Sequence, residues 1–180
     1  MNHGQFMIDA GRPEADEYDP AFAGYVARLD EDESVVAVLS QQIEGVPRRF
    51  DSAPETRGDY RYAPGKWSIK EVIGHLSDTE RVFAYRALRF GRGDEAGLPG
   101  FDDQSYVARM KAEGLSLADV VQDWLAVRTA TLTLFRNFPA AAWQRRGTAS
   151  GHAISVRALA YVIAGHTRHH LEVIDGRYGD

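Results

Sequence analysis

PGKWSIKEVIGHLSDTE, residues 64–80, decides the fold because it contains the clearest helix start in the chain. Ser68 stands at an N-cap position and Glu71 follows three residues later, the spacing of a capping box. Beyond Ser68, apolar side chains recur at steps of three and four residues until Gly91, which predicts a long helix with one buried face. The side chains on that face are Ile69, Val72, Ile73, Leu76, Phe83, Ala87 and Phe90.

A second helix of similar length is predicted in the third quarter of the chain. Ser116 and Asp119 form another capping pattern, and the apolar stripe that follows ends at Pro139, which cannot continue a helix. That stripe consists of Leu117, Val120, Val121, Trp124, Leu125, Leu132, Phe135 and Phe138.

Two further helices are predicted on either side of these. The acidic run at residues 30–33 suits the positive end of a helix dipole, and the apolar stripe of Val36, Leu39, Ile43 and Val46 that follows is stopped by Pro47. The last helix is expected over residues 155–175, with Gly176 as its C-cap. Residues 20–29 are expected to form a short helical segment.

The chain shows no run in which apolar and polar side chains alternate over the length of a strand. The fold class is therefore expected to be all-α, a four-helix bundle. Its connections over residues 50–65 and 91–114 are long enough to cross an end of the bundle and to wall a site. We expect a single domain over residues 1–180, with an irregular N-terminal segment over residues 1–18.

Composition argues against several classes of function. The 180 residues include no cysteine, which excludes disulfides, a cysteine nucleophile and thiolate metal sites. The 21 basic and 26 acidic residues give a net charge of −5, which argues against a nucleic-acid partner. No stretch approaches the roughly 18 apolar residues of a membrane span, and the first residues lack a signal-peptide pattern. We expect a cytoplasmic protein that binds neither nucleic acid nor membranes.

Two histidines interrupt the apolar face of the last predicted helix. His166 and His170 lie one turn apart, where apolar side chains are expected, and their burial costs free energy unless the ring nitrogens find partners. A divalent metal resolves this cost because neutral imidazoles at i and i+4 bind one ion from the same face. His169 points about 80° away from the stripe, so a pairing of His166 with His169 is a less favoured alternative.

His75 lies beside the apolar stripe of the 69–91 helix, at a depth where a neighbouring helix can bring it to the His166 and His170 pair. Three neutral histidines leave an open position on the metal, as catalytic sites do. Imidazole ligands suit several divalent metals, zinc and nickel among them. The alternative is a structural bundle whose core histidines are satisfied by hydrogen bonds.

Two carboxylates near His75 are candidates for proton handling. Asp78 lies one turn beyond His75 and can ligate the metal or orient its water; the alternative is an exposed helical aspartate. Glu80 lies on the apolar stripe and can hold a ligand imidazole by its free N–H. Equally, Glu80 can form a structural tie to a basic residue.

Three arginines follow on the same predicted helix. Arg86, Arg89 and Arg92 stand at helical spacing and are expected to form a solvated face. Arg86 lies 11 residues from His75, about 16 Å along the helix axis, which places it beyond direct contact with a ligand at the metal. The alternative is that these arginines attract an anionic substrate without direct contact at the metal.

Residues 64–80 together with GHTRHH at residues 165–170 resemble the DinB/YfiT-like metalloprotein superfamily. The resemblance covers roughly residues 30–180. It implies a four-helix bundle with an unusual connection order, often dimeric, that holds one divalent metal on His75, His166 and His170. It also implies an enzyme that acts on a small molecule, either a transferase that uses a low-molecular-weight thiol or a hydrolase. Since the chain has no cysteine, any thiol must come from a cosubstrate. A non-catalytic metal- or ligand-binding stress module is the alternative.

Overall fold

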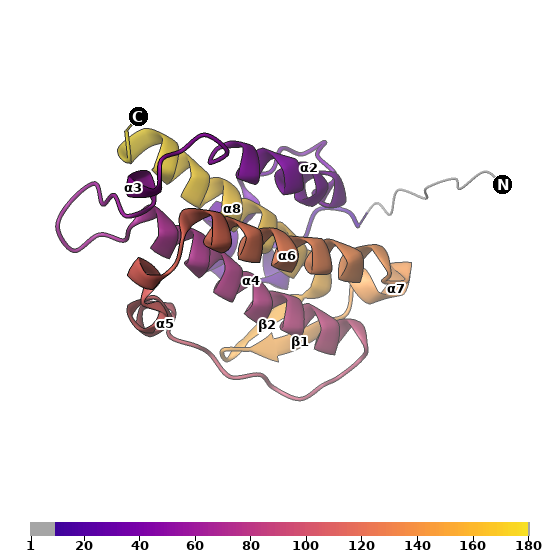
Figure 1. The fold of residues 1–180 in the computed structure, drawn as a ribbon. Helices are drawn as coiled ribbons and strands as arrows, with labels where there is room; N and C mark the ends of the chain where they lie inside the picture. The colour runs from indigo at the N-terminus through magenta and orange to yellow at the C-terminus, as the bar shows by residue number, and fades with distance from the viewer. Residues whose placement is uncertain (1–9, 180) are drawn as a thin grey trace.

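The computed structural model describes residues 10–179, in which four long helices form a bundle (Figure 1). The long helices are α2 (Val35–Arg48), α4 (Ile69–Gly91), α6 (Leu117–Arg136) and α8 (Val156–Arg177). The shorter elements are η1 (Ala15–Glu17), η2 (Pro20–Phe22), α1 (Ala23–Val26), α3 (Glu55–Gly58), α5 (Asp103–Met110), η3 (Ala112–Gly114), α7 (Ala140–Trp143), β1 (Arg146–Ala149) and β2 (His152–Ser155). The expected helical bundle is confirmed. Residues 1–9 of the expected irregular segment lie outside the described residues.

Serine caps begin three of the long helices, as the sequence indicates. Ser68 Oγ accepts a hydrogen bond from the Glu71 N–H at 3.2 Å, and the Glu71 carboxylate accepts one from the Ser68 N–H at 2.7 Å. Both halves of the predicted capping box are therefore formed. Ser116 and Ser155 accept the corresponding bonds at the starts of α6 and α8, each at 3.0 Å.

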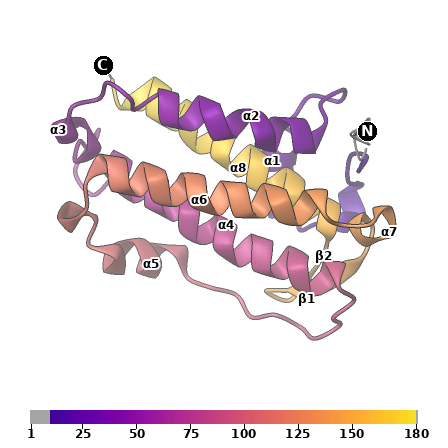
Figure 2. The same cartoon turned by 45° about the vertical axis from the view of Figure 1, so that its right-hand side comes forward.

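The four helices are connected in an unusual order. Both α2 and α4 pack against α6 and α8, so α2 lies diagonally opposite α4, and α6 diagonally opposite α8. Helices α4 and α6 run in one direction while α2 and α8 run in the other (Figures 1 and 2). The connection after α2 joins diagonal helices across one end, as expected. The connection after α4 instead returns along the side of the bundle, because its two helices are parallel neighbours (Figure 2).

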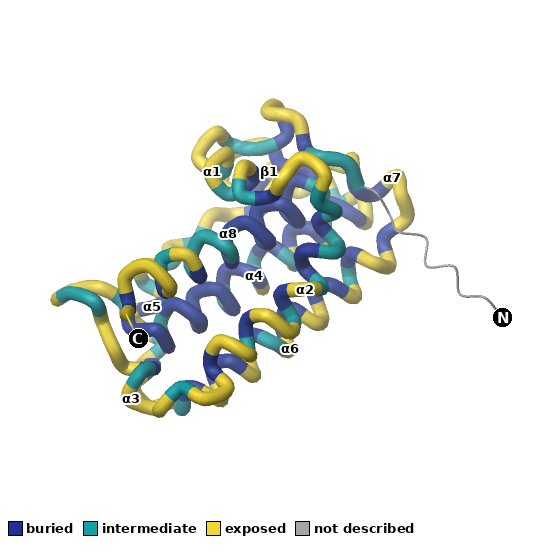
Figure 3. The backbone as a smooth tube through the Cα atoms, turned by 90° about the horizontal axis from the view of Figure 1, so that it is seen from above, coloured by how far each residue is buried: buried dark blue, intermediate teal, exposed yellow. Residues whose placement is uncertain are grey.

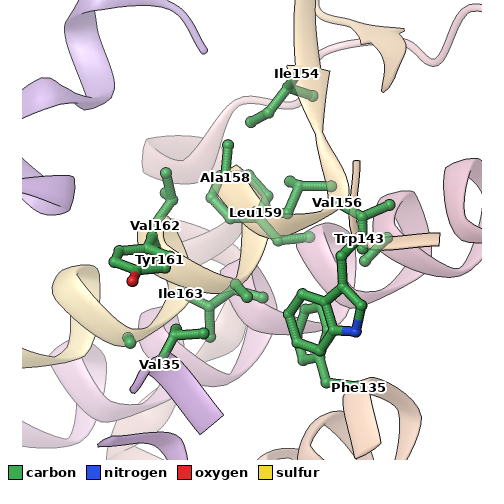
Figure 4. Close-up of a cluster of buried hydrophobic side chains, with 14 of the residues drawn as sticks. Val35, Phe135, Trp143, Ile154, Val156, Ala158, Leu159, Tyr161, Val162 and Ile163 are labelled. Carbon is green, nitrogen blue, oxygen red and sulfur yellow. The ribbon is translucent and has the colours of Figure 1, made fainter. Parts of the chain in front are cut away.

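Helix α8 is the central element of the bundle. Every residue from Ala158 to Thr167 is buried (Figure 3). On one side α8 packs against α1, and a Cβ atom on Gly165 would lie only 2.0 Å from the backbone oxygen of Tyr25. Only glycine allows this approach. At the N-terminal end of α8, the rings of Phe135 and Trp143 stack at 5.3 Å beneath its apolar side chains (Figure 4).

Two predicted helix ends differ from the structure. Pro47 lies in the last turn of α2, which ends one residue later; a proline there disturbs little because hardly any helix follows it. Gly176 lies inside α8 and the C-cap is Tyr178. The Tyr178 hydroxyl donates a hydrogen bond to the Trp67 carbonyl at 2.8 Å, which holds the final turn of α8 against the start of α4.

The antiparallel hairpin of β1 and β2 is absent from the sequence-based expectation. Its turn residues Ser150 and Gly151 have φ angles of 55° and 84°, the left-handed conformation of a two-residue hairpin turn. Leu98 from the long connection pairs beside β1, its N–H bonding the Thr148 carbonyl at 2.9 Å. The hairpin thereby fastens the connection to the end of the bundle. Helix α5 also lies in this connection, where only a loop was expected.

The segment before α1 is tied to this end of the bundle by one buried carboxylate. Glu17 is 2% exposed and accepts hydrogen bonds from Arg157 at the start of α8. Burial acts to raise the pKa of Glu17, but hydrogen bonds from Arg157 and Ser155 outweigh it and lower the pKa from 4.5 to about 2. The ionised carboxylate therefore stabilises the folded chain.

We predict that Glu17→Gln removes a pH-dependent part of stability. Because the folded-state pKa is lowered, this part is present above pH 4.5 and is lost as the pH falls towards 2. The difference in unfolding free energy between wild type and variant should be about 2–3 kcal/mol at pH 7 and should shrink below pH 4.5. Urea unfolding across this pH range measures it. A difference that stays constant down to pH 3 would contradict the prediction.

Candidate metal centre

Three histidines meet where α4 packs against α8. His75 comes from α4, and His166 and His170 come from successive turns of α8. The Nε2 atom of His166 lies 3.0 Å from Nε2 of His75 and 3.0 Å from Nε2 of His170. One nitrogen from each ring lies within 4.8 Å of the others, which brings together all three residues predicted as metal ligands.

Aromatic rings enclose the three imidazoles. Trp67, which precedes the N-cap of α4, lies 4.8 Å from the His75 ring and 6.5 Å from the His170 ring. Tyr25 lies edge-on to His166 at 5.2 Å, a position that the close contact at Gly165 allows. Neither aromatic residue was predicted from the sequence to lie at the site. Trp67 stands next to the N-cap, about two helical turns before His75 in the sequence. That spacing is the signal that could have placed it at the site.

Burial keeps the imidazoles neutral. Desolvation lowers the pKa of His75 to about 4, although the charge of Asp103 acts to raise it. Desolvation, reinforced by His75 and His169, lowers the pKa of His170 to about 3. His166 is the most deeply buried, and its pKa falls well below 6.5 for the same reasons. Each ring therefore offers a lone pair at neutral pH.

The donor set fits a divalent metal. In a neutral imidazole, Nε2 of His166 carries either one proton or one lone pair, so it forms a full hydrogen bond with only one of His75 and His170 at a time. Three facing nitrogens are satisfied together by a cation. Nitrogens bound to a tetrahedral zinc at about 2.0–2.1 Å lie about 3.3 Å apart, close to the two distances of 3.0 Å.

The two candidate carboxylates are held by arginines. Glu80 is buried and forms an ion pair with Arg128 of α6, whose Nε and Nη2 donate to its two oxygens at 2.8 Å each. This contact is the structural tie considered as one of its two possible roles. Asp78 is partly exposed and pairs with Arg81, which also binds Asp123. Burial raises the pKa of Asp78.

The remaining helical histidine, His169, lies beside the three-histidine group and outside it. Its ring contacts the rings of Tyr25 and His170 at 5.6 and 5.0 Å. Its Nδ1 atom is buried without a hydrogen-bond partner among the described residues. His152 lies on β2, with its Nδ1 atom 2.8 Å from a carboxylate oxygen of Asp19.

Two cavities reach the histidines. One, of about 250 Å³, is bordered by His75 and His166, and the other, of about 330 Å³, by His169 and His170. As expected, the long connection after α4 supplies walls, with Phe101 and Asp103 in the first cavity and Gln104 in the second. Contrary to expectation, Arg86 also lines the first cavity.

Comparisons with known proteins bear on the family and the fold of the chain. A family model described as the DinB superfamily matches residues 39–174. The chain belongs to the DinB superfamily. A solved structure with the same fold is YfiT from Bacillus subtilis, described as a probable metal-dependent hydrolase with an unusual four-helix bundle topology. This DinB-superfamily chain shares 15% sequence identity with YfiT at a TM-score of 0.72, over 88% of this chain and 90% of YfiT. Comparison with curated proteins found no match.

We predict that Glu80→Gln in this DinB-superfamily chain reduces stability and leaves metal binding intact. The substitution deprives the fully buried Arg128 of its counter-charge, which should cost about 3–5 kcal/mol in unfolding free energy. Urea unfolding measures the cost, and metal analysis of the folded fraction measures binding.

Asp123→Asn is the matched control for Glu80→Gln. It breaks an arginine–carboxylate pair that is exposed on the surface, so it should cost no more than about 1 kcal/mol. A Glu80→Gln protein of normal stability that has lost its metal would instead assign Glu80 to the metal centre.

Proposed function

We propose that the chain is a metal-dependent enzyme in which His75, His166 and His170 hold one divalent ion, zinc or nickel, through their Nε2 atoms. The observation that carries this proposal is the mutual approach of three neutral ring nitrogens from α4 and α8, two of them on buried residues. When bound, such an ion supplies positive charge that favours the deprotonated form of water or of a thiol and polarises a carbonyl group.

The surrounding residues prepare this site for chemistry on a small molecule. Trp67 and Tyr25 cover the imidazoles and restrict the access of water. Thr79 places its hydroxyl 3.5 Å from the outer ring nitrogen of His75, one helical turn away. Glu80, the residue after Thr79, holds α4 against α6 through its ion pair with Arg128. In this account, Glu80 and Asp78 support the structure and neither transfers protons.

The reaction that we favour is transfer involving a low-molecular-weight thiol. The two cavities border different members of the histidine group, which suits two substrates that approach from separate sides. The thiol must be a cosubstrate because the chain has no cysteine. Hydrolysis is the second candidate and is favoured by the description of YfiT as a probable metal-dependent hydrolase.

We further propose a cytoplasmic homodimer that does not bind nucleic acid. The net charge of −5 supports the absence of a nucleic-acid partner. The dimer is proposed by analogy with the family that the sequence resembles. Among the described residues, no helix has the length and apolarity to cross a membrane.

We predict that the metal depends on three of the four helical histidines. Tag-free wild-type protein loaded with zinc should contain near one ion per chain, and His75→Ala, His166→Ala and His170→Ala should each lose it. His169→Ala is the matched control and should keep the ion, because it is the neighbour of His170 that lies outside the group. Elemental mass spectrometry measures the content.

Thermal unfolding provides a second readout for the same variants. Zinc binds the folded state, so it should raise the melting temperature of wild type and of His169→Ala only. Four folded alanine variants without any change in metal content would contradict the proposed centre and leave a structural bundle.

We predict that turnover by the zinc-loaded protein requires a thiol. With N-acetylcysteine and 1-chloro-2,4-dinitrobenzene as probes, thiol loss should exceed that with the His75→Ala variant. Hydrolysis of 4-nitrophenyl acetate without thiol, at a rate that depends on His75, would favour the hydrolase. Zinc binding without turnover in either assay would favour the non-catalytic binding module.

A further inference from the structure

Arg86 is buried at the far end of the cavity that reaches His75 and His166. It is only 4% exposed, in contrast to the solvated position expected from its helical spacing with Arg89 and Arg92. Its Nη2 atom donates hydrogen bonds to the Pro99 carbonyl at 2.9 Å and to Ser150 Oγ at 3.0 Å. The 92–102 connection and the hairpin fold over α4 and cover most of this side chain.

No carboxylate among the described residues forms an ion pair with Arg86. The other deeply buried guanidinium of the bundle, Arg128, is neutralised by Glu80. Burial lowers the pKa of Arg86, and no acidic neighbour acts against this effect. A guanidinium has five N–H donors, and the two bonds from Nη2 leave three without a partner among the described residues. Buried charges are normally paired, so this exception calls for a ligand.

The cavity connects Arg86 with the candidate metal centre along one face of α4. His75, Thr79, Phe83 and Arg86 stand at positions i, i+4, i+8 and i+11, and all four line it. Arg86 and His75 are separated by about 16 Å along the helix axis, but their side chains border a single space. A molecule long enough to span that space contacts both ends.

The cavity wall indicates what kind of anion it accepts. Besides the residues of α4, the wall includes Phe22, Tyr25, Phe101, Asp103, Ser150 and His166. Aromatic side chains predominate, and the cavity of about 250 Å³ is below the roughly 300 Å³ of drug-sized sites. Asp103 contributes one negative charge against the positive charge of Arg86. These features suit a small monoanion with an apolar body better than a dianion.

We propose that Arg86 binds the carboxylate of a small substrate whose reacting group lies at the three histidines. This inference rests on the proposed metal-dependent function and adds the class of substrate. The donors that Pro99 and Ser150 leave free, on Nε and Nη1, can give charge-assisted hydrogen bonds to the carboxylate oxygens. The rings of Phe83 and Phe101, with centroids 5.3 and 5.8 Å from the guanidinium carbon, keep water from competing.

Ser150 is the positioning residue for this guanidinium. It stands in the hairpin turn with a φ of 55°, a conformation that is uncommon for residues other than glycine. Its hydroxyl accepts one of the two hydrogen bonds that fix Nη2, so the hairpin sets the direction in which the remaining donors point. The hairpin therefore has a function in the site.

The test measures binding of a simple carboxylate. Isothermal titration calorimetry compares 3-phenylpropanoate with its neutral analogue 3-phenylpropanamide and with inorganic phosphate, on zinc-loaded and on chelator-treated protein. Arg86→Gln should weaken 3-phenylpropanoate binding at least tenfold in both forms and leave amide binding unchanged. Arg86→Lys retains a positive charge with fewer donors and should recover part of the loss.

Two further variants control for structural damage. Arg89→Gln removes a neighbouring arginine of α4 that pairs with Asp94 outside the cavity, and it should bind the carboxylate as wild type does. Ser150→Gly suits the turn conformation and removes the hydroxymethyl group, so it should weaken carboxylate binding about two- to tenfold without unfolding the chain.

Several results would overturn the inference. One is equal carboxylate affinity in wild type, Arg86→Gln and Arg86→Lys. Another is carboxylate binding that requires zinc and is unchanged by substitution of Arg86, since the anion would then bind the metal. Tighter binding of phosphate than of 3-phenylpropanoate would overturn the assignment to a carboxylate. If zinc does not bind at all, the proposed function fails, and the metal-free titrations still test Arg86.

Discussion

One buried guanidinium, that of Arg128 on α6, bonds to the other three long helices. Its nitrogens donate to Glu80 of α4, Gln42 of α2 and Thr167 of α8, and Arg128 is fully buried. Gln42 extends the network to the Ala164 carbonyl of α8 at 3.0 Å. Unpaired buried polar groups are costly, so the four helices are stable together only in the register that satisfies all of these partners.

That register also determines the geometry of the histidines. Thr167 is adjacent to His166, and Glu80 lies little more than one turn beyond His75. Because α4 and α8 both bond to Arg128, their relative position along the bundle axis is set. This position determines which residues of α8 His75 meets, namely His166 and His170. Gly165 completes the arrangement by letting α1 approach α8 from outside. The histidines are thus held on rigid helices, as a metal centre with an open coordination position requires.

The sequence predicted those parts that local signals encode. The Ser68 cap and the histidines on apolar helix faces follow from helix geometry alone. Arg128 was missed, although it fills the gap between Trp124 and Leu132 in the apolar stripe of its helix, opposite a buried Glu80. The only local sequence signal for the hairpin is the Ser150–Gly151 turn dipeptide. Each strand has four residues, which is too short for a clear alternation of apolar and polar side chains. The burial of Arg86 depends on the tertiary packing of the 92–102 connection and the hairpin, which no local pattern reveals.

The most direct test of the account is X-ray absorption spectroscopy at the zinc edge of the metal-loaded protein. It reports the number and type of atoms bound to the metal, whether or not a substrate has been found. The geometry of α4 and α8 predicts three imidazole nitrogens at about 2.0–2.1 Å and one further light atom from solvent. A spectrum with one imidazole or none, or with a shell composed mainly of carboxylate oxygens, would contradict the central claim.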